Sequence, residues 1–591
     1  MNVGSYKIIE QKIIMQIHNR ICETPEEVLA SDLFKDILHR AITKLTKRNS
    51  YLMEIFDGKV IDDGDMCVLV QVFGFLTKMP VQLVPNVVPG AERFLRNPVL
   101  FHEFVEYLYN YWRSYDRFII ADSTGMDLVK RPYRTFHATI GHLTGLIRGM
   151  YRDVQENLTG VHPRIYRQVT AGAEVSTIAI TRDREWEDPL YAKLNVVPFI
   201  RQILLYPPLI LNPPMNKRTG RFERIRKNPL EFIDIHGSDW LCYPAKVGPL
   251  VIYVYFHHKF SELGHSLCNL FPLAEDEDLE RKPDAVFLFG APTEALDQFG
   301  VFPTVFYEDE KNDLLVGAIP GRNEFGYFGY VKKMVLTLHN IIMIKRGRLP
   351  FHGALVRVIL KGNRDFTILL IGDTGAGKSE TLEAFRELGE DHIQDLVVIA
   401  DDMGSLEIQE DGSVIGYGTE TGAFLRLDDL QPGYALGQID RAIIMSANQV
   451  NARIILPVTT YDIVIKGQKI DFIMYANNYE GVDPDYPIIE RFPSPEEAIK
   501  VFRDGKVMSK GTTTSTGITH SYFANVFGPP QYKAEHDLLA DKYFKAFFQA
   551  GVFVGQMRTR LGLSGWERQG PREAAQKLLE IFKNDTQGSV S

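Results

Sequence analysis

The chain is poor in cysteine, has no long apolar run and carries no excess of basic residues. Its 591 residues include only 4 cysteines, and none of them has the C-x-x-C spacing of a zinc-thiolate or redox pair. We therefore expect neither a disulfide framework nor a structural zinc site, and this usage fits a reducing cytoplasm. The formal net charge of −9 argues against a general nucleic-acid-binding surface.

Targeting and membrane signals are also missing. The N-terminal residues do not follow a secretory signal pattern, and no apolar run approaches the length of a membrane span, so we expect no membrane contact. With 45% hydrophobic and 24% charged residues, the composition is that of a globular protein. The length predicts two to four domains.

The most informative stretch is residues 366–380, which read FTILLIGDTGAGKSE. An apolar run typical of a buried strand leads into a glycine-rich turn and then into a helical pattern. The spacing from Gly372 through Gly377 to Lys378 and Ser379 is that of a Walker A loop, whose backbone N–H groups surround phosphates. The alternative is a glycine-rich turn with a chance lysine. The residues expected to bind the nucleotide are Gly372, Asp373, Thr374, Gly375, Ala376, Gly377, Lys378, Ser379 and Glu380.

A pair of carboxylates follows the next short apolar run. Residues 396–400 predict a strand, and Asp401 and Asp402 come directly after it. Oxygen ligands at the carboxyl end of a strand near a Walker A loop suit a nucleotide-bound metal. A solvated acidic turn is the alternative interpretation.

The chain pattern predicts four regions. Residues 1–180 read as mainly helical and contain no chemical constellation, so a role in partner recognition stays open. Residues 181–320 read as an α+β domain on the substrate side, with a basic cluster at 217–227. Residues 321–575 contain the Walker A loop, and residues 576–591 read as a polar tail.

A second pattern precedes the Walker A loop. Residues 327–333 read YFGYVKK, an apolar stretch follows, and residues 349–352 read LPFH, so His352 follows Lys333 by 19 residues. A lysine binds a metal only as the neutral amine, so burial and a nearby dication must lower its pKa, whereas histidine is a common ligand. The alternative for the Lys-Lys pair is surface charge at a helix start.

In these motifs the chain resembles phosphoenolpyruvate carboxykinase over about residues 265–565, and its Walker A loop also resembles that of HPr kinase/phosphorylase. The resemblance implies an α/β fold with a catalytic core of mixed β-sheets flanked by helices. It also implies ATP as the nucleotide, Mn²⁺ and Mg²⁺ as cofactors, and oxaloacetate or phosphoenolpyruvate as the small carboxylate.

The resemblance further implies roles for single residues. Lys333, His352 and Asp402 would bind the metal that activates the substrate, while Ser379 and Asp401 would serve the nucleotide-bound metal. The remaining implied site residues are Lys332 and Tyr327 at the substrate, Lys378 and Arg453 at the transferred phosphoryl group, Arg221 at the carboxylate, and Ile518 and Thr519 at the nucleotide base. Departures from the family pattern include Met403 and Gly404 after the carboxylate pair, and Thr516 where an arginine is usual.

We therefore expect a cytoplasmic enzyme that decarboxylates oxaloacetate and phosphorylates the enolate from ATP. The first alternative is an HPr kinase-like enzyme acting on a hydroxyl of a protein or small molecule, with Asp402 as general base. The second alternative is a regulatory protein that binds nucleotide without turnover.

Overall fold

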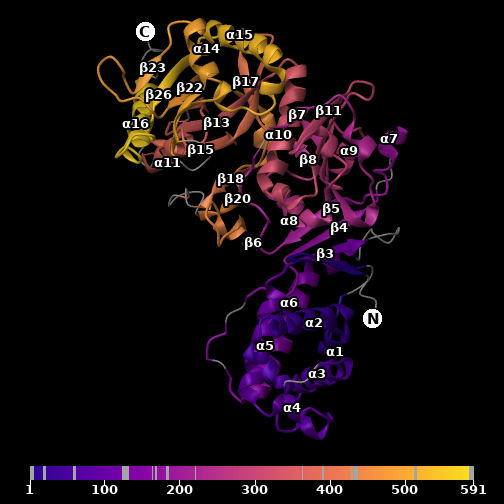
Figure 1. Ribbon diagram of the computed structural model, residues 1–591. Coiled ribbons are helices and arrows are strands. Elements are labelled where there is room, and N and C mark those ends of the chain that lie inside the picture. Colours follow the sequence, from indigo (N-terminus) through magenta and orange to yellow (C-terminus); the bar gives the residue numbers. More distant parts are fainter. Residues whose placement is uncertain are drawn as a thin grey trace. The chain divides into compact units, whose positions relative to one another are not determined.

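The computed structural model describes residues 5–17, 21–57, 61–122, 132–162, 164–166, 169–181, 185–219, 221–362, 364–388, 392–427, 430, 437–510 and 516–584. Helices and mixed sheets alternate through these residues, so the protein has the expected mixed α/β class (Figure 1). The chain divides into two compact units, Met1–Asp183 with Pro198–Tyr206 and Arg184–Val197 with Pro207–Ser591. Among the described residues, no helix combines the length and hydropathy that a membrane span requires.

The first unit packs helices against a small sheet whose strands follow the order β1-β2-β3-β4-β5. The pairs β2–β3 and β3–β4 are parallel, and the other two pairs are antiparallel. Its elements are β1 (Tyr6–Ile9), β2 (Lys12–Ile17), α1 (Pro25–Ala30), α2 (Asp32–Lys47), α3 (Asp63–Leu76), α4 (Glu92–Leu95), α5 (Pro98–Arg113), β3 (Asp116–Asp122), α6 (Pro132–Thr159), β4 (Val175–Ile180) and β5 (Phe199–Leu205). The long amphipathic helices of this unit agree with the mainly helical pattern expected for residues 1–180.

The strands of this unit are where the structure differs from the mainly helical expectation for residues 1–180. β2 reads KIIMQI and β3 reads DRFIIAD, and both are rich in β-branched residues. These runs are too short to show a period that separates a strand from a buried helix turn. Pairing with neighbouring strands, which sequence spacing does not reveal, decides their conformation.

The second unit contains a sheet with strand order β8-β9-β10-β12-β11-β7 and a four-stranded sheet with order β18-β20-β19-β6. Helix α10 begins directly after the first of these sheets and is buried along nearly its whole length. The elements up to this helix are α7 (Pro189–Ala192), β6 (Leu209–Leu211), β7 (Glu223–Arg224), β8 (Trp240–Val247), β9 (Leu250–His257), α8 (Ser261–His265), α9 (Asp276–Leu279), β10 (Ala285–Ala291), β11 (Val305–Asp309), β12 (Leu314–Pro320) and α10 (Phe328–Lys345).

A third sheet, with order β21-β17-β16-β13-β14-β22-β26-β23, positions the Walker A loop, and β15 pairs with β13. Strands β14, β22 and β26 are parallel, so their carboxyl ends meet at one edge. Its strands and helices are β13 (Leu349–Leu360), β14 (Arg364–Ile371), α11 (Lys378–Leu388), β15 (Ile393–Ala400), β16 (Met403–Ile408), β17 (Val414–Gly418), α13 (Tyr461–Lys466), β21 (Gln468–Lys469), β22 (Phe472–Asn477), β23 (Ile489–Arg491), α14 (Pro495–Asp504), α15 (Lys533–Gln549) and β26 (Phe553–Arg558). The strands β18 (Gly422–Arg426), β19 (Ile443–Met445) and β20 (Arg453–Pro457) belong to the four-stranded sheet, and β24 (Lys506–Lys510) pairs with β25 (Thr516–His520).

The last described element corrects the expected polar tail at 576–591. Residues Gln569–Asn584 form helix α16, which packs against α11 (Figure 1). Leu578 and Phe582 are fully buried, and the Phe582 ring stacks on Phe366 at 4.8 Å between centroids. Apolar residues at helical spacing therefore continue the core to Phe582, and residues 585–591 lie outside the described part of the chain.

Candidate active site

The Walker A loop lies between β14 and α11, as the sequence predicts for this motif. The end of β14 is buried, and Gly375 and Gly377 have φ angles of +78° and +98°, which favour glycine. A Cβ atom on Gly377 would lie 2.7 Å from the Thr559 side chain, so this position also requires close approach. Helix α11 starts at Lys378, so its N-terminal N–H groups point to the loop.

Lys378 is buried and turns back on the loop. Its ammonium group donates to the carbonyl of Gly372 and, at 3.1 Å, to that of Asp373. Burial lowers the pKa of Lys378, an effect that the carboxylates of Asp373, Asp402 and Asp401 oppose. The lysine and the carboxylate pair after β15 thus act on each other electrostatically.

Two buried side chains support the loop from the neighbouring strand ends. Asn478, after β22, donates to the carbonyl of Gly375 at 2.8 Å, and the hydroxyl of Thr559, after β26, donates to the carbonyl of Ala376 at 2.7 Å. Asn478 also bonds both backbone groups of Met508 in β24, at 2.8 and 2.9 Å. The loop, β22, β26 and β24 are therefore joined by side-chain hydrogen bonds.

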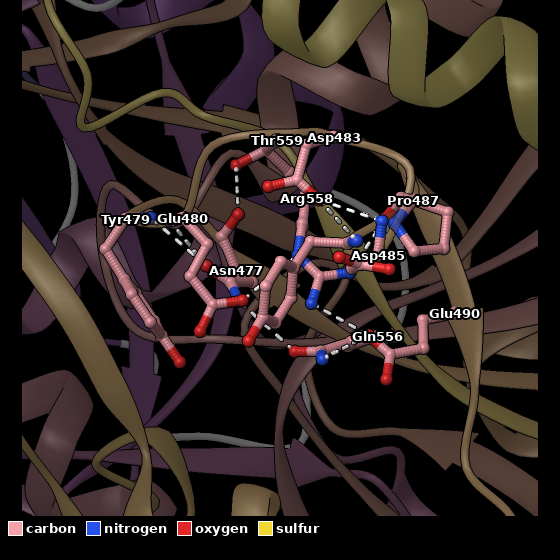
Figure 2. A network of polar contacts seen from close by, with 11 residues as sticks. Asn477, Tyr479, Glu480, Asp483, Asp485, Pro487, Glu490, Gln556, Arg558 and Thr559 are labelled. Atoms are coloured by element: carbon pink, nitrogen blue, oxygen red, sulfur yellow. Dashed lines mark hydrogen bonds and ion pairs between the residues drawn. The ribbon is translucent and has the colours of Figure 1, made fainter.

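A polar network fixes the chain that follows β22 (Figure 2). The guanidinium of Arg558, which is only 1% exposed, pairs with Glu480 at 3.0 Å and Glu490 at 2.7 Å and donates to the carbonyl of Pro487. Asn477 donates to Glu480 at 2.7 Å. Because a buried guanidinium with matched carboxylates has one favourable geometry, this network holds the strand ends that carry Asn478 and Thr559.

The central cluster joins α10, β13 and the end of β15. The ammonium of Lys332 lies 2.7 Å from Oδ2 of Asp402, and Nε2 of His352 lies 2.9 Å from Oδ1 of the same carboxylate. Lys332 also lies 3.3 Å from Glu420, a fully buried carboxyl that the sequence did not single out. Asp402 thus joins His352 to Lys332, the neighbour of the lysine that the sequence pattern paired with His352.

The surroundings of His352 fit metal binding. Its Nδ1 atom faces the carbonyl of Ala524 while Nε2 faces Asp402, so both nitrogens point at acceptors. A backbone carbonyl on one nitrogen is the usual partner of a histidine whose other nitrogen binds a metal. Phe523, Ala524 and Asn525, which form this turn, have φ angles of +45°, +57° and +66°. The backbone thus adopts a sparsely populated conformation where it orients the imidazole.

Lys333 contacts the same aromatic ring as His352. Its ammonium sits 4.6 Å from the centroid of the Phe527 ring, which also stacks on His352 at 6.1 Å. Burial, with a smaller effect of Arg218, lowers the pKa of Lys333 to about 8. Among the described residues, no group of three or more His, Cys, Asp or Glu side chains is placed to hold a metal. His352 and Asp402 would therefore need the amine of Lys333 to complete a three-residue ligand set.

The carboxyl groups of the cluster differ in protonation. Burial alone would raise the pKa of Asp402, but Lys332 and His352 lower it well below its usual value. Burial and repulsion by Asp402 raise the pKa of Asp401. Burial raises the pKa of Glu420 to about 8 despite the attraction of Lys332. The charges of Asp402 and Glu420 raise the pKa of Lys332 against its burial. Lys332 and Asp402 thus form a buried ion pair, and Glu420 beside them keeps its proton to a higher pH than an ordinary carboxyl group.

Three predicted residues gather around a second ring, Phe424 in β18. Its centroid lies 6.0 Å from the Tyr327 ring, 6.0 Å from the Lys332 ammonium and 5.5 Å from the Arg453 guanidinium. Burial raises the pKa of Tyr327, and the charges of Arg453 and Lys332 oppose this effect. Tyr327 and Arg453, which we expect to contact the substrate and the phosphoryl group, thus lie around the same ring as Lys332 of the Lys332–Asp402 pair.

Arg221 is not part of this cluster. Its side chain is exposed, and its backbone carbonyl accepts a hydrogen bond from Thr304 at 2.7 Å. Arg218 lies nearer to the cluster, and its charge interacts with Lys333, Tyr327 and Tyr330. The backbone of the next residue bonds Tyr330 of α10. Which arginine of a basic loop faces inward depends on this contact, which spacing alone does not reveal.

Several of the remaining predicted positions, in the Walker A loop and in β25, are at least partly exposed to solvent. Ser379 is exposed at the start of α11, and Asp373 accepts hydrogen bonds from the Thr374 backbone at 2.7 Å and from Ser521 at 3.1 Å. Ile518, which is 48% exposed, and Thr519 lie in strand β25 rather than in an open loop. β25 pairs with β24, which Asn478 ties to the Walker A loop.

Comparison with protein-family models and with curated proteins gives no match to this chain. The functional argument therefore depends on the residues and geometry described above. Of the residues that the sequence pattern did not reveal, Asn478 has the clearest signal: it is a polar residue directly after an apolar strand, where parallel strands place ligand contacts. Glu420 and Phe424 have no comparable signal, because a single glutamate or phenylalanine between short strands is usually structural.

Proposed function

We propose that this protein is a metal-dependent phosphotransferase of the phosphoenolpyruvate carboxykinase type, which converts oxaloacetate and ATP into phosphoenolpyruvate, CO₂ and ADP. The observation that supports this most is the arrangement of Asp402 between Lys332 and His352, beside a lysine of lowered pKa and in electrostatic reach of Lys378. A phosphate-binding loop alone would not need this second cluster. The carboxykinase-type core is part of this proposal.

Two cation positions follow from the donor sets. Lys333, His352 and Asp402 would hold one divalent cation, and Ser379 with Asp401 would serve another on the nucleotide. A bound divalent cation there supplies fixed positive charge for the oxygen atoms of the enolate and of the phosphates. The amine, imidazole and carboxylate set suits Mn²⁺, and hydroxyl and carboxylate oxygens suit Mg²⁺.

The chain's own cations would handle the charge that moves during the reaction. When oxaloacetate loses CO₂, the electron pair of the broken C–C bond forms an enolate, whose oxygen then attacks the γ-phosphorus of ATP as the bond to the β-phosphate oxygen breaks. Lys332 and Arg453, held at Phe424, would face the enolate and the incoming phosphoryl group. Lys378 would offset the negative charge that develops on the phosphates of ADP. Positioned cations of this kind lower the barrier without moving a proton.

The state of Asp402 favours this reaction over transfer to a hydroxyl. A hydroxyl kinase needs a general base, and a base works best with a pKa near the working pH. Asp402 has a pKa well below its usual value because it is paired with Lys332 and His352, so it is a weak base. An enolate is already anionic and needs no base, so an ion-paired carboxylate suits it.

A kinase acting on a hydroxyl is the second candidate, and Asp401 is the observation that favours it. Burial and the neighbouring Asp402 raise the pKa of Asp401, which makes it a better proton acceptor than its neighbour. In this case residues 1–180 would provide partner recognition. The cluster of Lys333 and His352 would then have no evident task at the acceptor.

The test measures phosphoenolpyruvate, because oxaloacetate also loses CO₂ spontaneously. Purified protein with Mn²⁺, Mg²⁺, ATP and oxaloacetate should form phosphoenolpyruvate and ADP in equal amounts. Lys378→Met should abolish the product, whereas Lys345→Met, on the exposed end of α10, should leave it. Label transfer from γ-labelled ATP to a hydroxyl compound or protein, without phosphoenolpyruvate, would establish the second candidate instead. Nucleotide binding without either product would point to a regulatory protein.

A further inference from the structure

The first unit contains an apolar cavity of about 140 Å³ that is partly open to its surface. Its wall is built from β2, the segment before α1, and helices α1, α2, α3, α5 and α6, all within this unit. Val105 and Leu108 of α5 face it from one side, and Leu143 and Val154 of α6 from another. These four side chains are buried, whereas Phe34 and Trp112 of the same wall are partly exposed, so the cavity reaches from the core of the unit toward its surface.

The wall offers an occupant hydrocarbon and aromatic surface. Three of its polar groups have hydrogen-bond partners: the Tyr151 hydroxyl donates to Glu106, the Trp112 indole N–H donates to the carbonyl of Ala171, and the Ser31 hydroxyl donates to the carbonyl of Val28 at 2.6 Å. None of the wall residues is charged. Since an unpaired charge or amide is costly in such surroundings, a polar ligand would bind poorly.

The size of the cavity sets the size of its occupant. Protein interiors are close-packed, and few voids exceed the volume of a water molecule. An apolar cavity of about 150 Å³ stays dry and takes up benzene in other proteins. Leaving such a space empty lowers stability, because the lining atoms lose contacts that an occupant would restore.

We propose that the first unit binds one small, uncharged, hydrophobic molecule in this cavity, an aromatic ring or a hydrocarbon chain of roughly six to ten carbon atoms. This site is separate from the proposed phosphotransfer site, all of whose residues belong to the second unit. Binding therefore requires neither nucleotide nor metal. A failure of the proposed reaction would leave this proposal unaffected, and the reverse also holds.

Trp112 in the wall provides a direct readout. Bromobenzene, whose bromine quenches a neighbouring indole, should quench the fluorescence of the full-length protein saturably, and the saturable part should vanish in Trp112→Phe. Calorimetry of Trp112→Phe should still show uptake of bromobenzene. 4-Bromobenzoate, of similar size but anionic, should bind at least about tenfold more weakly because its carboxylate would lose hydration.

A matched pair of variants on α5 locates the site. Val105→Phe fills the cavity and should weaken bromobenzene binding at least tenfold, whereas Val99→Phe, at a position that is 68% exposed, should leave it within twofold. If Val105→Phe does not fold, a size series in the unmodified protein decides: benzene and toluene should bind, and pyrene should not. Linear quenching without saturation, or binding of pyrene as tight as that of toluene, would overturn the proposal.

Discussion

The Nε2 atom of His352 lies 2.9 Å from Oδ1 of Asp402, while its Nδ1 atom faces the carbonyl of Ala524. Both ring nitrogens thus face oxygen acceptors. A divalent cation bound between Nε2 and Asp402 would leave the contact of Nδ1 with Ala524 in place.

We predict that His352→Ala and Lys333→Ala each weaken Mn²⁺ binding by at least about tenfold, since each would remove one of the three proposed ligands. Electron paramagnetic resonance of free Mn²⁺ measures this directly. Lys345→Ala, near the other end of α10, is the matched control and should bind Mn²⁺ like the unmodified protein.

The same titration has a pH dependence with a defined sign. Because the pKa of Lys333 is lowered to about 8, its amine is mostly protonated at pH 6.5 and mostly neutral at pH 9. Affinity for Mn²⁺ should therefore rise with pH and level off above about pH 8. In Lys333→Ala this rise should be smaller. Equal pH profiles in the two proteins would show that the amine is not a ligand.

The two positive-φ glycines of the Walker A loop should respond differently to a methyl group. Gly375→Ala meets no atom within 4 Å and carries only the backbone strain of φ +78°, about 1 kcal/mol. Gly377→Ala combines φ +98° with a Cβ atom 2.7 Å from Thr559. We expect Gly377→Ala to lose ATP binding and Gly375→Ala to weaken it by about tenfold or less, as measured by calorimetry. The reverse order would contradict the packing described for this loop.

Thr559 supports the loop through its hydroxyl, which donates to the carbonyl of Ala376. Thr559→Val keeps the shape but leaves that buried carbonyl without its donor, a loss of about 1–3 kcal/mol, whereas Thr559→Ser keeps the donor. ATP affinity should fall in Thr559→Val and recover in Thr559→Ser. If both variants lose equal affinity, the methyl group and not the hydroxyl supports the loop.

Sequence reasoning found the features that are local in the chain. The Walker A loop needs only a strand, three glycines and a helix start, and these lie within residues 366–380. The sequence paired Lys333 with His352; the structure places both beside the Phe527 ring, whereas the ion pair with Asp402 comes from Lys332. The carboxylate pair after β15 was found by its position at a strand end.

Residues that reach the cluster through distant contacts were not predictable. Glu420 meets Lys332 only because the chain after β17 packs against α10, and Phe424 meets Arg453 across the pairing of β18 with β20. The sequence pattern favoured Arg221, whereas the charge of Arg218 acts on Lys333 and the adjacent Thr219 bonds Tyr330 of α10. Sheet register and loop packing, which depend on the whole core, carry this information.

Glu420 provides the last prediction. Its folded pKa of about 8 lies above the ordinary 4.5 because burial disfavours the charged form, so it holds a proton at neutral pH that an unfolded chain would release. Stability from this proton is fully present below pH 4.5 and is lost as pH rises toward about 8. Glu420→Gln, which resembles the protonated acid, should flatten the fall of Tm between pH 5 and pH 8.

Infrared spectroscopy tests the proton itself. The unmodified protein should show the C=O stretch of a buried protonated carboxyl group at pH 6 that disappears with a midpoint near pH 8, and Glu420→Gln should lack this band. Glu496→Gln, at an exposed site on α14, should keep it. Because the amide copies the protonated state, Glu420→Gln should keep the proposed phosphotransfer at pH 7 and lose less of it than the unmodified protein at pH 9. A band unchanged by Glu420→Gln would mean that another carboxyl group holds the proton, with Asp401, whose pKa is also raised, as the next candidate.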